Sequence, residues 1–316
     1  MSPPLLSVIA CIFNESAALP HFFDRLLPVL EKATQGNYEV VCVDDGSKDD
    51  SLQKLLDMSH RNNRIRIVEL SRNFGKEAAL TAGLEYATGH AVVPIDADLQ
   101  DPPEFIADMF SSWQAGAEAV LARRINRDSD TLAKRQSASW FYSLYNRVSP
   151  MPLPENVGDF RLLDRKVVDA LKQLPERQRF MKGIFSWVGF KTVTLDYARE
   201  NRVAGKSKFS GWRLWNLAME GITSFTTLPL RIWTYIGLLG ASASASYAVF
   251  IILHTLIHGK DVPGYASLLV AVLFMGSMQL ISIGLIGEYI GRLYMEAKQR
   301  PIYLVRSATG FDRQSR

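Results

Sequence analysis

Several common signatures are missing from this chain of 316 residues. It has two cysteines, Cys11 and Cys42, and no Cys-x-x-Cys pair or histidine cluster, which argues against a disulfide framework or a zinc site. The net charge is only +4, and the basic residues form no dense stripe interleaved with aromatic residues, so we expect no nucleic-acid partner. No Gly-x-Gly-x-x-Gly or Gly-Lys-Ser/Thr loop follows an apolar run, which disfavours dinucleotide and Walker-type binding. No signal sequence opens the chain, so we expect a cytoplasmic N-terminus.

Charged residues are also missing from two long stretches near the end of the chain. Residues 232–259 and 262–287 contain no Asp, Glu, Lys or Arg. Each stretch is longer than the ~20 apolar residues that cross a bilayer. We therefore predict a hairpin of two transmembrane helices, over about 232–257 and 264–288. A buried hairpin in a soluble protein is the weaker alternative, because two such stretches stand side by side.

Positive charges flank this hairpin at both outer ends. Arg231 precedes the first stretch, and Arg292, Lys298 and Arg300 follow the second. By the positive-inside rule, both ends of the hairpin and both termini should face the cytoplasm. We expect residues 211–231, which are rich in Trp, to lie at the membrane interface. The tail at 291–316 should be cytoplasmic, and its polar residues from Ser307 onward mobile.

The first 210 residues alternate apolar runs with helical segments. Strands are predicted at residues 6–13, 38–43, 65–70, 92–96 and 118–124, with helices between them. Regular alternation of strand and helix predicts a doubly wound, mostly parallel α/β sheet. In such a sheet, a ligand binds outside the carboxyl ends of the strands.

Acidic side chains collect where these strands end. An apolar strand cannot keep unpaired carboxylates inside a sheet, so Asp96 and Asp98 should lie where their strand leaves it. Side chains two apart on an extended chain point the same way, and two such carboxylates suit Mg²⁺ or Mn²⁺ bound together with substrate phosphates. A simple turn into a helix explains residues 101–104 but not the two acids before them. Other acids are expected at the same edge: Glu15, Asp44 and Asp45.

Four short motifs stand at the ends of successive strands. They are residues 13–15 (Phe-Asn-Glu), 43–47 (Val-Asp-Asp-Gly-Ser), 71–76 (Ser-Arg-Asn-Phe-Gly-Lys) and 96–103 (Asp-Ala-Asp-Leu-Gln-Asp-Pro-Pro). Together they resemble the inverting family 2 glycosyltransferases of GT-A fold. Over nearly the whole chain, the resemblance narrows to polyisoprenyl-phosphate glycosyltransferases, relatives of dolichol-phosphate mannose synthase, and within them to the bacterial bactoprenol glucosyltransferases.

This resemblance implies a metal-dependent enzyme of the bacterial inner (plasma) membrane. It would move a sugar, with glucose from UDP-glucose as the first choice, onto undecaprenyl phosphate. Donors carrying aminoarabinose or GDP-mannose would use the same visible motifs. The resembled family includes tetramers, and small residues such as those at 241–246 suit contacts between membrane helices, so self-association is an open expectation.

The resemblance also implies roles for individual residues. The nucleotide would be bound by Phe13, Glu15, Asp44, Asp45, Arg72, Lys76 and Asp96. The metal, Mg²⁺ or Mn²⁺, would be bound by Asp96, Asp98 and Gln100. Asp159, in a Gly-Asp-Phe-Arg segment, matches the catalytic acid beside the acceptor. Because a lipid phosphate is largely dianionic at neutral pH, Asp159 either takes the proton of the minority monoanion or only positions the acceptor.

A basic loop matches the family's Arg-x-x-Gly-x-Ser-Lys pattern. Its Arg202, Lys206 and Lys208 are the first candidates to bind the acceptor phosphate, and Arg123 and Arg124 are the second. On charge alone, a solvated basic loop would be the better interpretation. The aromatic-rich segment at 137–148 is equally compatible with a core helix and with a helix at the membrane interface.

Two other functions remain open at this point. A processive polysaccharide synthase shares the early Asp motifs, but it should carry Gln-x-x-Arg-Trp and more membrane spans. An inactive membrane partner built on the same fold could have lost any of its acidic residues, yet Asp45, Asp98 and Asp159 are all present. Both are weaker than the polyprenyl-phosphate interpretation.

Overall fold

The computed structural model describes residues 4–125, 154, 156–177, 179, 181–198, 228–258 and 264–311. The chain divides into two compact units. One comprises Met1–Ala218 together with Arg300–Arg316, and the other comprises Met219–Gln299.

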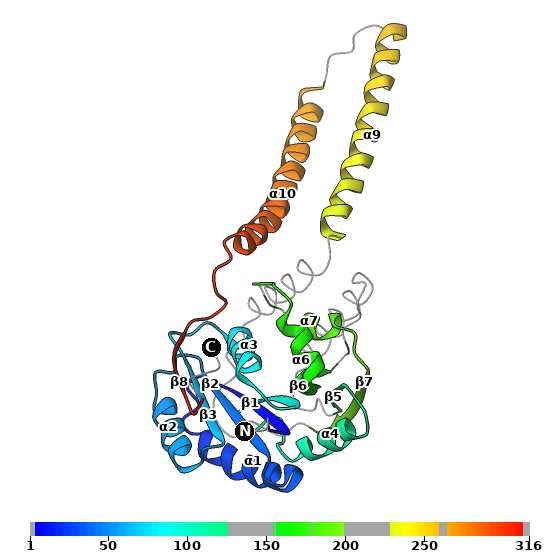
Figure 1. The fold of residues 1–316 in the computed structure, drawn as a ribbon. Coiled ribbons are helices and arrows are strands. Elements are labelled where there is room, and N and C mark those ends of the chain that lie inside the picture. The colour runs from blue at the N-terminus through cyan, green and yellow to red at the C-terminus, as the bar shows by residue number, and fades with distance from the viewer. Residues whose placement is uncertain are drawn as a thin grey trace. The chain divides into compact units, whose positions relative to one another are not determined.

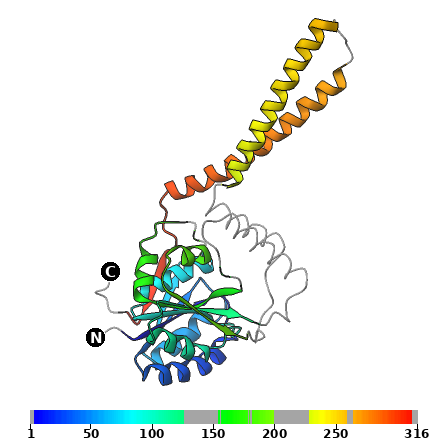
Figure 2. The ribbon, with the colours of Figure 1, turned by 90° about the vertical axis from the view of Figure 1, so that its right-hand side faces the viewer.

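The first unit is built on one mixed sheet with helices on both faces (Figures 1 and 2). Its described strands are β1 (Leu6–Ile12), β2 (Tyr38–Asp44), β3 (Ile65–Leu70), β4 (Ala91–Asp96), β5 (Ala119–Arg124), β6 (Val157–Asp164), β7 (Thr192–Tyr197) and β8 (Val305–Thr309). Its described helices are α1 (Leu19–Thr34), α2 (Ser51–Arg61), α3 (Lys76–Tyr86), α4 (Phe105–Gln114), α6 (Arg165–Lys172) and α7 (Met181–Trp187). All five predicted strands form, each within one residue of its expected bounds.

The strands lie in the order β7-β5-β6-β4-β1-β2-β3-β8. Ladders β4-β1-β2-β3 and β5-β7 are parallel, whereas β6 and β8 run antiparallel to their neighbours. This order confirms the doubly wound, mostly parallel α/β sheet. The chain leaves β1 toward β2 on one side and returns to β4 on the other, which places a crevice at the carboxyl ends of β1 and β4.

Alternate residues of β1 face opposite layers of helices. Val8 and Ile12 join a core formed with α1, α2 and α4, and Ile9 faces α3 on the other side. A Cβ atom at Gly83 of α3 would lie 2.2 Å from Ile9 Cγ2, so glycine allows α3 to pack directly on the strand. This close packing carries Lys76, the first residue of α3, to the crevice beside β1 and β4.

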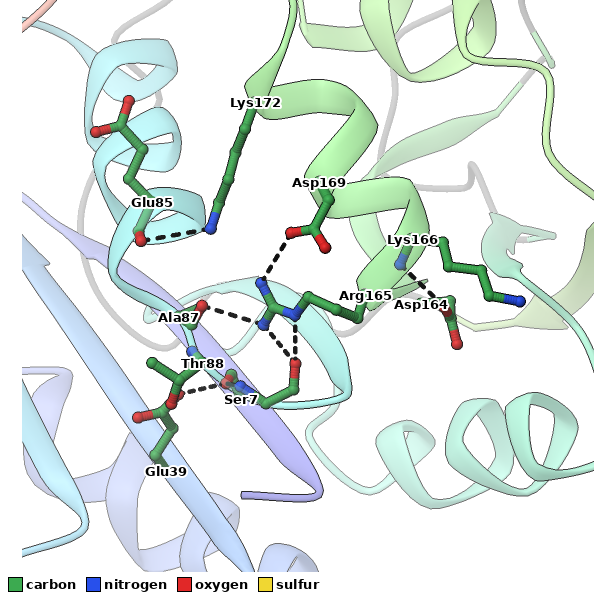
Figure 3. Close-up of polar contacts among 11 residues, drawn as sticks. Ser7, Glu39, Glu85, Ala87, Thr88, Asp164, Arg165, Lys166, Asp169 and Lys172 are labelled. Atoms are coloured by element: carbon green, nitrogen blue, oxygen red, sulfur yellow. Dashed lines mark hydrogen bonds and ion pairs between the residues drawn. The ribbon is translucent and has the colours of Figure 1, made fainter. Parts of the chain in front are cut away.

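A buried polar network ties the amino edge of the sheet together (Figure 3). One carboxylate oxygen of Glu39 accepts hydrogen bonds from Ser7 Oγ at 2.5 Å and from the N–H of Thr88 at 2.6 Å. The other pairs with Arg66 Nη1 at 2.7 Å. From α6, Arg165 donates to the carbonyl oxygens at the end of α3, including that of Ala87 at 3.0 Å. The loop between α3 and β4 is therefore held from both sides.

Residues 307–309 are not part of the mobile tail that we predicted from Ser307 onward, and the residues after 311 lie outside the described part of the chain. Residues Val305–Thr309 form β8, which pairs antiparallel with β3 at the edge of the sheet. The expectation rested on polar composition. It was wrong because an edge strand needs only backbone pairing, and its outward side chains can stay polar.

The second unit consists of α9 (Leu228–His258) and α10 (Tyr265–Ala297), which contact each other in a helical hairpin (Figure 1). In the part of the chain that the structure describes, one segment, Ile232–His258, is long and apolar enough to cross a membrane, with a mean hydropathy of 1.9. The second predicted crossing, over 264–288, stays a prediction. Large apolar side chains are exposed on both helices, among them Leu239, Leu256 and Leu280.

The buried Glu39 network yields a stability prediction with a matched control. Glu39→Gln removes a charge that receives three hydrogen bonds and an ion pair, so we expect it to cost about 2 kcal/mol or more in unfolding free energy. Glu31→Gln disrupts only an exposed pair with Arg64 and should change stability by less than about 0.5 kcal/mol. Denaturant unfolding of both variants in detergent measures the difference, and equal losses would contradict the prediction.

Candidate active site

The loops that follow β1 and β2 are bonded into one unit. The N–H of Asn14 donates to Ser47 Oγ at 3.0 Å, and the N–H of Lys48 donates to Asn14 Oδ1 at 2.7 Å. The N–H of Glu15 donates to Ser51 Oγ at 3.0 Å. Phe13 and Glu15, both predicted to bind nucleotide, therefore lie on a loop that is held against the second strand's loop.

Asp45 connects this unit to the loop after β3. Its two carboxylate oxygens accept from the N–H groups of Phe74 and Gly75, at 2.7 and 2.9 Å. Burial raises the pKa of Asp45 despite these donors, and burial likewise raises that of its neighbour Asp44. In the structure Asp45 orders backbone; its predicted role in binding the nucleobase remains a prediction.

The two loops also approach each other closely at Gly46. Gly46 has a φ of +68°, and a Cβ there would lie 2.6 Å from the carbonyl carbon of Arg72, so only glycine suits this position. The Arg72 side chain is exposed and stacks on the ring of Phe74, with its guanidinium carbon 4.1 Å from the ring centre. A cation on this rim is suitably placed for an anionic ligand.

The centre of the site is an ammonium group between two carboxylates. Lys76 Nζ lies 2.8 Å from Asp96 Oδ2 and 2.7 Å from Asp159 Oδ2. The three residues come from the first turn of α3, the end of β4 and the start of β6. Because β6 runs antiparallel to β4, with Ala91 paired to Asp164, the start of β6 lies toward the end of β4 that carries Asp96.

Their charges shift one another's titration. Burial alone would lower the pKa of Lys76, but the two carboxylates raise it well above its ordinary value. Burial would raise the pKa of Asp159, but Lys76 and Lys182 hold it below its ordinary range. For Asp96, burial raises the pKa more than Lys76 lowers it. Asp159 is therefore a carboxylate at neutral pH.

A small cleft surrounds these three groups. It is lined by Cys11, Lys76, Leu80, Pro94, Ile95, Asp96, Asp101, Asp159 and Phe160. Burial raises the pKa of the Cys11 thiol, so this cysteine stays protonated and serves as a small packing group. Cys42 is fully buried in the core.

Of the three predicted metal ligands, Asp96 is among the residues that line this cleft. Asp98 is buried, its Oδ1 accepts from the N–H of Gln100 at 3.1 Å, and Leu99 between them has a φ of 60°. The charge of Asp98 contributes to the raised pKa of Asp96, so the two carboxylates are neighbours. Within the described ranges, no group of three or more His, Cys, Asp or Glu side chains could hold a metal by itself. Two carboxylates fit a hard cation that takes its other ligands from substrate phosphates and water.

A second polar network, which includes Asp101, was not predicted from the sequence. Tyr197 of β7 donates its hydroxyl hydrogen to Asp101 Oδ1, and Arg124 Nε donates to the Tyr197 oxygen at 3.0 Å. Phe105 and Phe160 pack their rings on Tyr197. Nothing in the local sequence marks Tyr197, because its partners lie 73 and 96 residues away.

The predicted phosphate ligands fall into two groups. Arg123 makes a bidentate pair with Asp196, at 2.6 and 2.9 Å, and Arg124 faces Tyr197 and Asp101. Both arginines thus have protein partners, and their role toward phosphate stays a prediction. Arg202, Lys206 and Lys208 lie outside the described residues, as does the aromatic segment at 137–148.

Comparison with known proteins shows the family. Residues 7–172 match glycosyl transferase family 2, and residues 228–293 match the family described as the GtrB C-terminal hairpin. The chain therefore belongs to glycosyltransferase family 2 and is a glycosyltransferase by class.

Within this class, the chain is similar over nearly its whole length to several relatives at about half identity. An uncharacterized glycosyltransferase of Synechocystis is 52% identical over 97% of this chain and 96% of its own. The bactoprenol glucosyl transferase of Shigella phage SfX is 51% identical over 96% of this chain and 99% of its own. Among solved structures, a mannosyltransferase from Pyrobaculum calidifontis in complex with GDP-Man and Mn²⁺ covers 95% of this chain and 87% of its own, at 16% identity and a TM-score of 0.48.

Glu77, beside Lys76, yields a pH prediction. Burial and the charge of Asp159 raise the pKa of Glu77 from 4.5 to about 7, against the opposing effects of Lys76, the Met181 N–H and Lys182. A raised folded-state pKa means that the native state holds the proton more tightly than the unfolded chain. The contribution of Glu77 to stability is thus complete below pH 4.5 and is lost as pH rises through about 7.

Glu77→Gln keeps the neutral form at every pH. Compared with wild type, we expect its unfolding midpoint in denaturant to rise between pH 5 and pH 8, whereas Glu31→Gln, at an exposed position of α1, should show no such change with pH. A constant offset between Glu77→Gln and wild type at the two pH values would contradict the assignment.

Proposed function

We propose that this protein transfers glucose from UDP-glucose to undecaprenyl phosphate, with inversion at the anomeric carbon. The observation that carries the proposal is the similarity, over nearly the whole chain, to bactoprenol glucosyl transferases at about half identity. The site agrees with this reaction, because it combines paired carboxylates with cationic groups at the carboxyl edge of the sheet. The product would be a polyprenyl-phosphate-sugar that donates glucose to a surface glycan.

We assign donor binding to the residues at the carboxyl ends of β1 to β4. We assign a divalent cation, Mg²⁺ or Mn²⁺, to Asp96, Asp98 and Gln100, where it would neutralise charge on the departing diphosphate. Arg72 lies on the exposed rim and can contact the nucleotide phosphates. Phe13, Glu15, Asp44 and Asp45 shape the loops that would enclose the nucleoside.

Asp159 acts as a positioning group rather than as a general base. A base works best when its pKa lies near the working pH, and Lys76 and Lys182 keep that of Asp159 below its ordinary range. Its Oδ2 instead holds the Lys76 ammonium at 2.7 Å. A phosphate acceptor that is already largely dianionic needs no base. Asp159 therefore keeps a cation between the donor side and the acceptor side of the cleft.

The acceptor phosphate is assigned to Arg202, Lys206 and Lys208, with Arg123 and Arg124 as second candidates. The partners of the latter two, Asp196 and the pair of Tyr197 and Asp101, make them less available for a ligand. Glycine flanked by cations would let the basic loop approach phosphate oxygens.

The hairpin of the second unit would anchor the enzyme in the bacterial inner membrane. Exposed leucines on α9 and α10 need an apolar surrounding, and a bilayer supplies one. The first unit includes both the residues before α9 and strand β8 after α10. Two spans, with both termini in the cytoplasm, would let the chain rejoin this unit on the side from which it left.

The transfer reaction can be tested directly. Radiolabelled UDP- and GDP-sugars are offered with undecaprenyl phosphate, with Mg²⁺, Mn²⁺ or a chelator. We expect glycolipid from UDP-glucose, dependent on the metal, and a loss of about 100-fold or more in Asp98→Asn. Asp108→Asn, an exposed acid on α4, is the matched control and should keep full activity. Product from another donor would correct the sugar, and the absence of lipid product from every donor would overturn the reaction.

The membrane topology has its own test. An alkaline phosphatase fused after His258 should be active, because the turn of the hairpin would lie outside the cytoplasm, whereas a fusion after Gln299 should be inactive. Activity in both fusions would show a single crossing, and activity in neither would show that the hairpin does not span the membrane.

A further inference from the structure

The segment that enters β8 binds both backbone polar groups of Ser71, the first residue of the loop between β3 and α3. The N–H of Ser71 donates to the carbonyl of Leu304 at 2.8 Å. The carbonyl of Ser71 accepts from Arg306 Nη2 at 2.9 Å. Ser71 opens the loop that carries Arg72 and leads to Lys76, so this contact joins residues 235 apart at the edge of the site.

Arg306 makes a second contact that fixes its orientation. Its Nη1 pairs with Glu69 Oε1 at 3.0 Å, while Ser307 Oγ donates to Glu69 Oε2 at 2.8 Å. Glu69 is 12% exposed at its side chain, so its charge depends on these partners. The ladder between β3 and β8 shifts register between Glu69 and Leu70, and Arg306 falls at this irregularity, opposite the end of β3. The Arg306 guanidinium thus connects Glu69, near the end of β3, to the carbonyl of Ser71, the first residue of the loop.

The far end of the same loop is held by another group. Asp45 accepts from the N–H groups of Phe74 and Gly75. The loop is therefore fixed at two points, by Arg306 where it leaves β3 and by Asp45 where it enters α3. Between them stands Arg72, whose own contacts are to Asn73 and Phe74 within the loop. Its position relative to the cleft depends on both anchors.

We propose that Arg306 is a positioning residue for the nucleotide-sugar donor, acting through Glu69 and Ser71 on the loop that carries Arg72 and Lys76. This inference rests on the proposed function, which assigns that loop to the donor. It gives the end of the chain a part in donor binding that its polar composition does not suggest.

The strand has other attachments that should survive removal of Arg306. Tyr303 donates its hydroxyl hydrogen to Glu85, and Phe311 packs its ring against Tyr86 at 4.9 Å between centres. Arg66 also lies over the ring of Phe311. Because these contacts hold β8 on both sides of Arg306, a substitution there should loosen the loop without detaching the strand.

The test compares wild type with Arg306→Met, which keeps the length of the side chain and removes its charge. We expect the KM for UDP-glucose to rise about tenfold, since a charged hydrogen bond to the loop is lost. The KM for undecaprenyl phosphate should stay nearly unchanged, whereas the melting temperature should fall by a few degrees, because the mostly buried Glu69 loses its ion pair. Arg306→Lys, which can pair with Glu69 but cannot bridge to Ser71, should lie in between. Arg64→Met, which removes a pair with Glu31 in which both side chains are exposed, is the control and should keep the wild-type KM for UDP-glucose.

Binding of UDP with Mn²⁺ by calorimetry, without acceptor, provides a readout separate from turnover. A weaker affinity in Arg306→Met supports the inference, and wild-type affinity together with wild-type donor KM overturns it. An equal loss toward donor and acceptor would show a general structural role and also overturn it. If wild type makes no glycolipid from any donor, the proposed function fails, and the UDP affinities alone decide the role of Arg306.

Discussion

The site depends on one interaction, the Lys76 ammonium held between Asp96 and Asp159 at 2.8 and 2.7 Å. The three side chains come from distant parts of the chain, and the charge of each would be unfavourable there without the other two. Two carboxylates in a half-buried cleft would repel each other, and partial removal from water would lower the pKa of the ammonium, but together the three groups stabilise their charged forms. The arrangement links the end of β4, where the donor's metal is assigned, to the start of β6, where the acceptor is expected.

Much of the remaining structure serves to bring these groups into place. Gly83 lets α3 lie on Ile9 of β1, which sets the position of Lys76. Asp45 and Gly46 bind the loop after β3 to the loop after β2, and the Arg306 side chain fixes where that loop begins. The Tyr197 hydroxyl connects Asp101, which follows the predicted metal ligand Gln100 in the sequence, to Arg124 at the end of β5. These contacts attach the short loops around the cleft to the sheet, so the sheet keeps the loops rigid.

Sequence patterns were most informative where the structure is local. Continuous apolar runs predicted five strands to within a residue, because a strand covered on both faces can carry few polar groups. The same reasoning placed Asp45, Asp96 and Asp98 at strand ends, and all three lie there. It failed for residues 307–309, which belong to an edge strand, and it did not suggest Tyr197. Polar composition describes the exposure of side chains, and the backbone pairing of an edge strand does not depend on it.

The sequence by itself therefore determined the class of fold, the edge of the sheet that binds ligands, and the family, because these follow from apolar periodicity and from motifs a few residues long. Only the tertiary structure decided which charges meet. The antiparallel direction of β6 beside β4 brings Asp159 and Asp96 to the same Lys76, and the pairing of β8 with β3 brings Arg306 to Ser71. Such contacts depend on strand order and direction, which set distances across the sheet that no local pattern of residues contains.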